Sequence, residues 1–281
     1  MSSNIQTVDF KSENAGGQFV ESLHNTGFAI IHNHPLDFNL ITSVYDEWGT
    51  FFNSDTKHSY TYNPDTQDGY FPYRSENAKG YSAKDLKEFY HIYEWGEYPN
   101  NISRETILLY HKLIAIGKDL LSWIDENSPE IVKSKFSMPL SDMIENSRMN
   151  LMRIIHYPPI ESDISDGSIR AAAHGDINLI TVLPAGSQSG LQFQTQEGKW
   201  MDIKCDPDWL VINTGDMLKE CSSGYYPSTI HRVINPKGEA TQFPRYSMPV
   251  FIHPRDEVVL SDKYTARDFL DERLIEIGLK S

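Results

Sequence analysis

The stretch Ala172–Leu183 reads Ala-Ala-His-Gly-Asp-Ile-Asn-Leu-Ile-Thr-Val-Leu and places a His-x-Asp pair directly before an apolar, β-branched run. Side chains alternate between the two faces of an extended strand, so His174 and Asp176 are predicted to project from the same side. An imidazole and a carboxylate on one face supply two ligands of a His-His-carboxylate facial site. That ligand set suits non-haem Fe(II) and leaves coordination positions open. The stretch therefore predicts part of a metal site, with a third ligand elsewhere in the chain.

The region around this stretch has the composition of a β-rich core. From residue 149 to about residue 253, short segments rich in Val, Ile, Leu and Phe are separated by Gly, Pro, Asn and Asp. Many short strands with turn residues at this spacing favour a jelly roll or barrel. The predicted strands are residues 149–157, 169–174, 177–183, 190–194, 199–203, 209–213, 230–235 and 245–252.

Helical spacing of apolar residues prevails on either side of this core. The predicted helices are residues 17–26, 37–52, 103–127, 137–144 and 263–278. Gly27 is expected to end the first helix, and Ser103 to cap the start of the long one. Short strands are expected at residues 7–10, 28–31 and 85–92, and residues 53–80 are interpreted as a long surface loop.

The order of these elements predicts a mainly β protein with flanking helices (α+β). No Gly/Ser-rich linker divides the 281 residues. We therefore expect one structural unit in three parts, which are an N-terminal region (residues 1–148) packed on the core, the core (149–253) and a C-terminal helical extension (254–281).

Composition argues against several classes of partner and location. Lys and Arg number 25 against 39 Asp and Glu, a net charge of −14. Such a balance is unsuited to nucleic acid, which is bound by clustered cations. The first residues lack a signal-peptide pattern, and no apolar run reaches the length of a membrane span, so we expect no membrane partner and a cytoplasmic protein. The two cysteines, Cys205 and Cys221, are expected to be reduced thiols.

The third ligand must come from another strand. The other histidines of the β-rich region are His156, His231 and His253, and His231 opens the strand-like segment 230–234. Further on, Arg245 and Ser247 share one strand face, where a guanidinium and a hydroxyl can hold a carboxylate. Read singly, each of these residues is more often a core or surface residue. His32 and His34 form another i, i+2 pair, but with no acidic partner they favour a turn held by hydrogen bonds.

The joint pattern is more specific than its parts. His174-Gly175-Asp176, His231 and Arg245-Tyr246-Ser247, in this order, resemble the iron/2-oxoglutarate-dependent dioxygenase superfamily, in its isopenicillin N synthase-like branch. Further segments that resemble the family in the same order are residues 8–10, 27–34, 152–159, 190–193, 198–200, 211–218 and 222–233.

The resemblance implies a double-stranded β-helix core in which His174, Asp176 and His231 bind Fe(II). It also implies that Arg245, Ser247 and Tyr157 hold the distal carboxylate of 2-oxoglutarate. The activity implied is hydroxylation or desaturation of a small-molecule substrate with O₂, releasing succinate and CO₂, with ascorbate as a reductant. Residues 1–148 correspond to the non-catalytic N-terminal region, and 149–253 to the catalytic core.

Two positions depart from the family pattern. Ile155 stands where many relatives have asparagine, and Gly175 stands where threonine is frequent. Two other functions stay open at this point. One is an oxidase that uses Arg245 and Ser247 to hold its substrate's own carboxylate, and the other is a catalytically silent β-barrel binding module.

The substrate and the oligomeric state are not encoded in any motif. Pocket walls are expected from residues 53–80 and 85–92 and from the C-terminal helix. Arg74, Lys84, Lys87 and Tyr90 are candidates for binding an acidic substrate, although solvated surface charge is the more ordinary interpretation of each.

Overall fold

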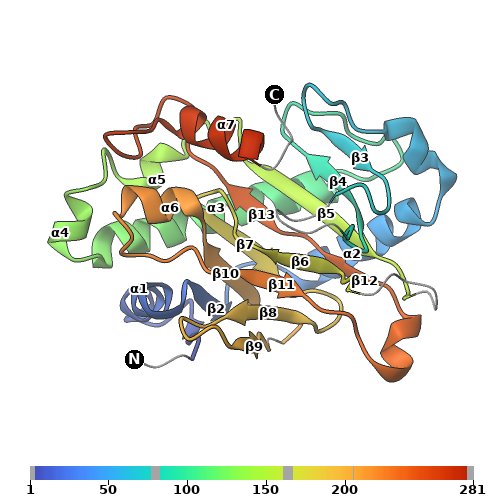
Figure 1. Cartoon of the computed structure of the whole chain (residues 1–281), viewed down its shortest axis with the longest axis horizontal. Coiled ribbons are helices and arrows are strands. Elements are labelled where there is room, and N and C mark those ends of the chain that lie inside the picture. Colours follow the sequence, from blue (N-terminus) through green and yellow to red (C-terminus); the bar gives the residue numbers. More distant parts are fainter. Residues whose placement is uncertain (1–3, 77–82, 161–166, 205, 277–281) are drawn as a thin grey trace.

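The computed structural model describes residues 4–76, 83–160, 167–204 and 206–276. Two sheets form its centre (Figure 1). In the larger sheet the strands follow the order β1 (Thr7–Asp9), β2 (Phe28–His32), β10 (Leu210–Thr214), β7 (Ile180–Pro184), β13 (Val250–Ile252), β5 (Leu151–Tyr157), β4 (Glu88–Ile92) and β3 (Gly69–Phe71), and β12 (Arg245–Ser247) also pairs with β5. The smaller sheet has the order β6 (Ala171–His174), β11 (His231–Val233), β8 (Leu191–Gln194) and β9 (Trp200–Asp202). The mainly β core with flanking helices is thus confirmed.

Strands of the N-terminal region extend the larger sheet at both edges. The N-terminal strand β2 pairs antiparallel with β10, and β4 pairs antiparallel with β5. Residues 245–252, predicted as one strand, form two, because the chain leaves the ladder at Met248 and Pro249 between β12 and β13. Proline has no N–H to donate, so it interrupts a ladder.

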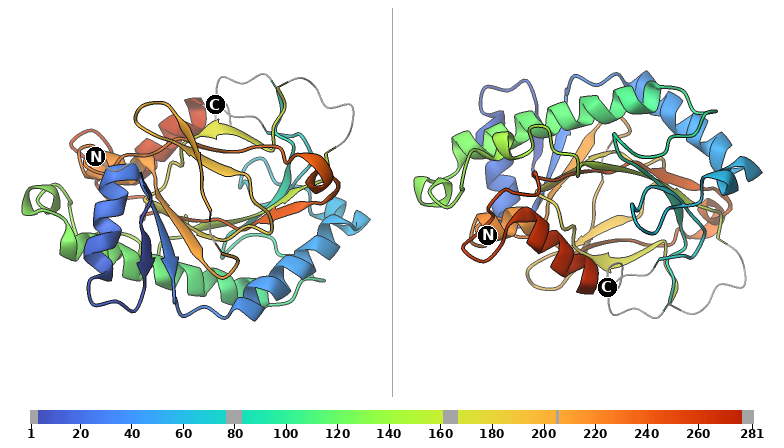
Figure 2. Two further views of the ribbon diagram at one scale, coloured as in Figure 1. Left: turned by 90° about the horizontal axis from the view of Figure 1, so that it is seen from below. Right: turned by 90° about the horizontal axis from the view of Figure 1, so that it is seen from above.

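Three helices cover the outer side of the larger sheet, while the smaller sheet lies on the other side (Figure 2). They are α1 (Ala15–Thr26), α2 (Phe38–Phe52) and α3 (Glu105–Asn127). The long helix α3 packs against β7 and β13. At Gly117 a Cβ atom would stand 3.1 Å from Ile252 Cγ1, so glycine permits this close approach of helix and sheet.

The helix ends follow local chemistry. Gly27 ends α1 in the left-handed conformation (φ 72°), as predicted. Asp37 precedes α2, and its carboxylate accepts the N–H of Asn39. The expectation for α3 was off by one residue, because Arg104 precedes the helix. The Ser103 hydroxyl still accepts the N–H of Glu105 at 3.2 Å.

Several short elements differ from the sequence-based expectation. The expected loop at residues 53–80 contains the 3₁₀ helix Asp55–Tyr60 and strand β3, and residues 77–80 lie outside the described part. The expected helix at 137–144 is a single turn, α5 (Leu140–Met143), and α7 covers Ala266–Glu276 of the expected 263–278. Helices α4 (Glu130–Lys133) and α6 (Asp216–Cys221) and the 3₁₀ helix Gly238–Gln242 were not predicted. Turns this short carry too few residues to show a periodicity.

The hydrophobic residues separate into a main core and two smaller clusters. The main core joins the helices to the larger sheet and is centred on fully buried side chains such as Trp48 and Leu113. A small cluster joins the two sheets and consists of Phe71, Phe89, Ile155, Tyr157, Ala171 and Val233. Burial of each large apolar side chain contributes about 1.5–3 kcal/mol. This small cluster holds β6 and β11 against β5, which fixes the position of the residues described next.

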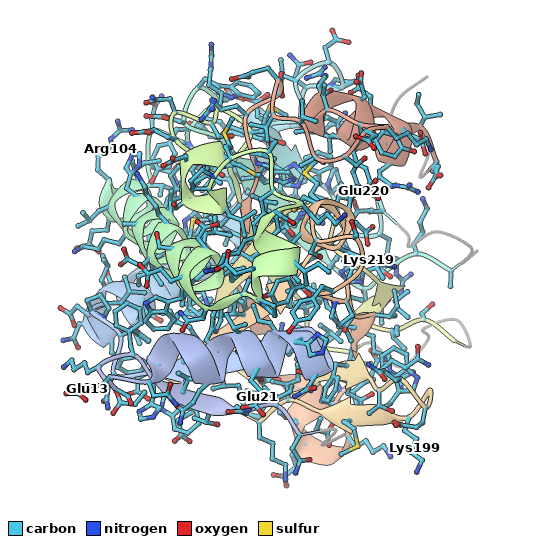
Figure 3. All side chains as sticks on the ribbon, turned by 90° about the vertical axis from the view of Figure 1, so that its left-hand side faces the viewer. Glu13, Glu21, Arg104, Lys199, Lys219 and Glu220 are labelled. Carbon is cyan, nitrogen blue, oxygen red and sulfur yellow. The ribbon has the colours of Figure 1, made fainter. Side chains whose placement is uncertain are left out.

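Some charged side chains lie at the surface. Glu13, Glu21 and Lys199, which are labelled in Figure 3, are exposed. Cys221 is a buried free thiol, while Cys205 lies outside the described residues. Among the described helices, none has the length and apolar character needed to cross a membrane.

Candidate metal centre and anion pocket

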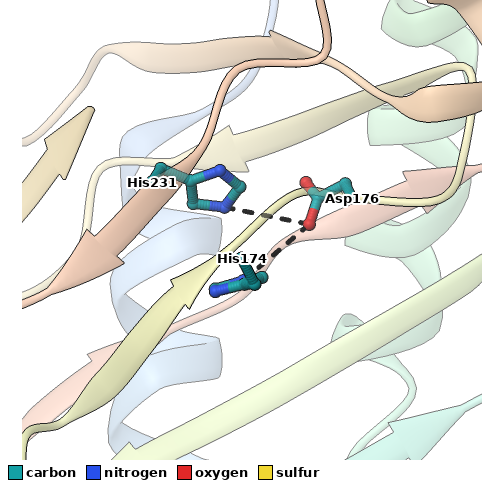
Figure 4. Close-up of side chains that lie close together, drawn as sticks. All are labelled: His174, Asp176 and His231. Carbon is teal, nitrogen blue, oxygen red and sulfur yellow. Dashed lines mark ion pairs between the residues drawn. The ribbon is translucent and has the colours of Figure 1, made fainter. Parts of the chain in front are cut away.

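Two histidines face each other across the smaller sheet. His174 ends β6 and His231 begins β11, and the two are direct antiparallel partners with ring centroids 4.5 Å apart. Asp176 follows two residues after His174. Asp176 Oδ1 lies 4.0 Å from His174 Nε2 and 3.8 Å from His231 Nε2 (Figure 4). One ligand atom from each residue lies within 4.8 Å of the other two, so these three predicted residues converge.

Asp176 reaches this position from a turn and not from a strand. Strand β6 ends at His174, so the expectation that both side chains share one face of an extended strand was wrong in its geometry. The turn is held by α6, because the N–H of Asp216 donates to the carbonyl of Asp176 at 2.8 Å. At Gly215 a Cβ atom would lie 2.1 Å from the carbonyl oxygen of Asn178. Only glycine fits there, and the helix docks directly on the turn.

Each histidine has its second ring nitrogen anchored. His174 Nδ1 lies 2.7 Å from the carbonyl oxygen of Ala172, and His231 Nδ1 lies 3.2 Å from that of Thr229. A carbonyl oxygen only accepts, so Nδ1 carries the proton and donates in both rings. The lone pair of each Nε2 is then free on the side that faces Asp176. This is the arrangement that orients imidazoles in metal sites.

The carboxylate of Asp176 is anchored in the same manner. Its Oδ2 accepts hydrogen bonds from Thr181 Oγ1 at 2.5 Å and from Asn213 Nδ2 at 2.8 Å. Asn178 Nδ2 donates in turn to Thr181 Oγ1 at 2.9 Å. These bonds leave Oδ1 free toward the histidines. Sequence reasoning missed Asn178, Thr181 and Asn213, although each is a polar residue within an apolar strand-like run, which was the available signal.

The protonation states suit metal binding. Burial, with the neighbouring His231, lowers the pKa of His174 to about 4. Burial opposes ionisation of Asp176, but His231, His174 and the two hydrogen-bond donors lower its pKa below the usual range. At neutral pH the set is therefore a neutral imidazole beside a carboxylate, which are the forms that bind divalent metals. Asp176 and His231 are nearly buried, and 39% of the His174 side chain is exposed.

The other histidines considered as ligands lie outside the group formed by His174, Asp176 and His231. His156 Nδ1 lies 2.7 Å from Glu88 Oε1, and His253 Nδ1 lies 3.2 Å from the carbonyl of Phe251. His34 contacts the carbonyl of Asp208 at 2.6 Å and accepts the N–H of Leu36, which confirms the interpretation as a hydrogen-bonded turn.

The expected carboxylate-binding residues lie on β12 and β5. Arg245 pairs with Tyr157 and Ser247 pairs with Ile155. All four are buried, and the Arg245 guanidinium carbon lies 5.2 Å from the centroid of the Tyr157 ring. Tyr246, between Arg245 and Ser247, stacks on His156 instead. The alternation therefore places Arg245, Ser247 and Tyr157 on a common side.

The Arg245 side chain is prepared for an anion. Its Nε donates to the carbonyl of Gln188 at 3.0 Å, while its Nη1 is buried and has no hydrogen-bond partner. A Cβ atom at Gly186 would stand 2.6 Å from Nη2, so this glycine makes room for the guanidinium. An unpaired buried guanidinium is costly, and a carboxylate bound to Nη1 would satisfy it. These residues fit the distal carboxylate of a dicarboxylate such as 2-oxoglutarate.

A buried ionic cluster adjoins the metal ligands. Lys87, expected at the surface, is 7% exposed and pairs with Glu76 at 2.8 Å and Asp85 at 2.9 Å. Asp85 Oδ1 also accepts the N–H of Ala172 at 3.0 Å. Between the pairs His231–His174 and Val233–Ala171, two residues of β6 stand opposite one of β11, so Asp85 binds an N–H that the irregular pairing releases. The carbonyl of the same Ala172 orients His174.

The comparisons with known proteins agree with this geometry. The profile of the 2OG-Fe(II) oxygenase superfamily matches residues 149–254, and that of the non-haem dioxygenase N-terminal region, described from morphine synthesis, matches residues 5–108. A solved structure of a candidate oxygenase from Shewanella oneidensis is 46% identical and superposes with a TM-score of 0.89, covering 98% of this chain and 99% of that one. The chain belongs to the 2OG-Fe(II) oxygenase superfamily.

Membership confirms the resemblance to the isopenicillin N synthase-like branch and the double-stranded β-helix core. By family the chain is a non-haem Fe(II)/2-oxoglutarate oxygenase. The proline hydroxylase buaE of Petromyces alliaceus is 28% identical over 285 residues, covering 90% of this chain and 88% of that protein. The 2-oxoglutarate-dependent dioxygenase citB of Monascus ruber is 39% identical over 94 residues, which cover only 32% of this chain and 29% of that protein.

Proposed function

We propose that this protein is an Fe(II)/2-oxoglutarate-dependent dioxygenase that hydroxylates or desaturates a small molecule with O₂ and releases succinate and CO₂. One observation carries the proposal. Three anchored side chains present Nε2, Oδ1 and Nε2 to a common point, and the same fold holds the buried Arg245 guanidinium, whose Nη1 has no hydrogen-bond partner.

In this proposal His174, Asp176 and His231 hold Fe(II). Arg245 and Ser247 bind the distal carboxylate of 2-oxoglutarate beside the ring of Tyr157. Iron and co-substrate supply the O₂ chemistry that amino-acid side chains lack. Ascorbate is proposed as the reductant that keeps the iron ferrous.

The protein's own contribution is orientation and exclusion of water. Thr181 and Asn213 keep Asp176 ionised and fixed, and the backbone carbonyls of Ala172 and Thr229 keep both imidazoles in the ligating tautomer. The apolar cluster of Phe71, Phe89, Ile155, Tyr157, Ala171 and Val233 gives the region between the sheets a dry lining. The exposed edge of His174 is the side on which a substrate can approach.

We propose that the chain has the three regions that the family resemblance implies. Residues 149–253 form the catalytic core, residues 1–148 the non-catalytic N-terminal region and residues 254–281 a helical extension. The proposed substrate is a small molecule.

The test is an anaerobic spectroscopic titration. Purified protein is loaded with Fe(II), 2-oxoglutarate is added, and the weak visible metal-to-ligand charge-transfer band is recorded for the wild type and for Arg245→Ala. The proposal predicts a band that needs iron and is lost or strongly weakened in Arg245→Ala. Iron binding without a band would favour the oxidase that holds its substrate's own carboxylate. Absence of iron binding would leave the β-barrel binding module.

A further inference from the structure

A second arginine is buried beside Arg245. Arg170 directly precedes β6 and is 0% exposed, although nothing in the sequence marked it as a site residue. Its guanidinium carbon lies 5.9 Å from the centroid of the Tyr157 ring, on which Arg245 also lies at 5.2 Å. Both arginines also bind Gln188, Arg245 through the backbone carbonyl and Arg170 through the side-chain oxygen at 3.3 Å. The two guanidiniums are therefore neighbours around one tyrosine ring.

Among the described residues, neither member of this positively charged pair has an acidic partner. None of the ion pairs among the described residues involves Arg170 or Arg245. Burial and the charge of Arg245 lower the pKa of Arg170 to about 10, which still leaves it charged at neutral pH. Burying two like charges side by side is unfavourable unless an anion compensates them.

The hydrogen bonds of Arg170 do not account for its charge. Its Nη2 donates to the carbonyl of Phe243 at 3.1 Å, and its Nη1 donates to the side-chain oxygen of Gln188. Both acceptors are uncharged, so an uncharged donor such as a glutamine amide could bind them as well. Its Nε is buried without a partner, as is Nη1 of Arg245. Each of the two adjacent guanidiniums therefore has one buried nitrogen whose N–H has no acceptor.

We propose that Arg170 is a second cationic contact for the distal carboxylate of the co-substrate, acting together with Arg245. The inference rests on the proposed function, and it adds a specificity-determining residue to it. A carboxylate between the two arginines receives charge-assisted hydrogen bonds from both. The pocket then selects 2-oxo acids that end in a carboxylate over those of equal length that end in a methyl group.

The experiment compares two keto acids on the Fe(II)-loaded protein under anaerobic conditions. Calorimetric titrations with 2-oxoglutarate and with 2-oxopentanoate, which has the same chain length without the distal carboxylate, are made on wild type, Arg170→Gln and Arg170→Lys. Arg255→Gln is the matched control, because Arg255 also donates to backbone carbonyls, but to those of Asp142 and Glu145 and not to those of Gln188 or Phe243. Iron affinity is measured for every variant.

The inference predicts that Arg170→Gln weakens 2-oxoglutarate binding by about tenfold or more, the loss of a hydrogen bond to a charged group. The dissociation constants of 2-oxopentanoate and of iron should change by less than about twofold in Arg170→Gln. Arg170→Lys should recover part of the lost 2-oxoglutarate affinity, because lysine keeps the positive charge. Equal weakening of both keto acids would mean that Arg170 only supports the fold, and unchanged 2-oxoglutarate binding would also overturn the inference. If the wild type itself binds no 2-oxoglutarate with iron, the proposed function fails, and the inference fails with it.

Discussion

Replacing Thr181 by valine tests whether the anchoring of Asp176 controls metal affinity. Thr181 is 2% exposed, and its hydroxyl donates to Asp176 Oδ2 at 2.5 Å while accepting from Asn178 Nδ2 at 2.9 Å. Valine keeps the shape, so no cavity forms and only the two hydrogen bonds are lost. A bond to a carboxylate contributes about 1.5–3 kcal/mol and a neutral one about 1 kcal/mol, and the added methyl group regains part of the sum. We expect the metal-free protein to lose about 2–3 kcal/mol of unfolding free energy.

The same substitution should weaken iron binding by about 10–100-fold, the usual effect of removing a partner of a metal ligand. Anaerobic Fe(II) titration against a competing chelator gives the affinity, and urea unfolding with a chelator present gives the stability. Thr214→Val is the matched control. Thr214 is fully buried on the neighbouring strand β10, and its hydroxyl donates to the carbonyls of Gly27 and Pro227, not to Asp176. Iron affinity within about twofold of wild type in Thr181→Val, or an equal loss in Thr214→Val, would refute the reasoning.

Three further predictions concern the surroundings of the site. Asp85→Ala leaves the buried N–H of Ala172 unpaired and removes a partner of Lys87, so urea unfolding should show a loss of about 1–3 kcal/mol or more, and a loss below about 0.5 kcal/mol would contradict this role. Gly186→Ala places a Cβ 2.6 Å from Arg245 Nη2, so calorimetry should show 2-oxoglutarate affinity reduced by about tenfold with iron affinity retained, whereas a parallel loss of both would indicate general misfolding. Burial opposes ionisation of Glu76, but Arg153 and Lys87 hold its pKa well below the usual value of 4.5. A folded pKa below the unfolded one gives stabilisation that is present above pH 4.5 and is lost as the pH falls further. Unfolding at pH 7 and at lower pH should therefore show a steeper acid loss for the wild type than for Glu76→Gln, and identical slopes would exclude this contribution.

The sequence determined the features that depend on near neighbours. Alternating or continuous apolar runs predicted the core strands to within a few residues, and Gly27 marked the end of α1, because these signals act within one turn or one strand. The three metal-ligand candidates were also predictable, because a His-x-Asp pair before a strand and a later His-led strand are rare in combination. The family membership that the comparisons show was predicted from the same ordered motifs.

The tertiary structure alone decided which polar residues meet these ligands. Asn213 approaches Asp176 because β10 pairs with β7, and Thr181 lies on β7 itself, so sheet register joins residues far apart in the chain. The burial of Lys87 depended on Glu76 and Asp85 folding around it, where composition alone favoured a solvated side chain. Arg170 became a candidate only when packing against Tyr157 set it beside Arg245. The local spacing of apolar residues indicates which face of a helix or strand is buried. Which buried charges pair with each other is determined only when the two sheets pack together.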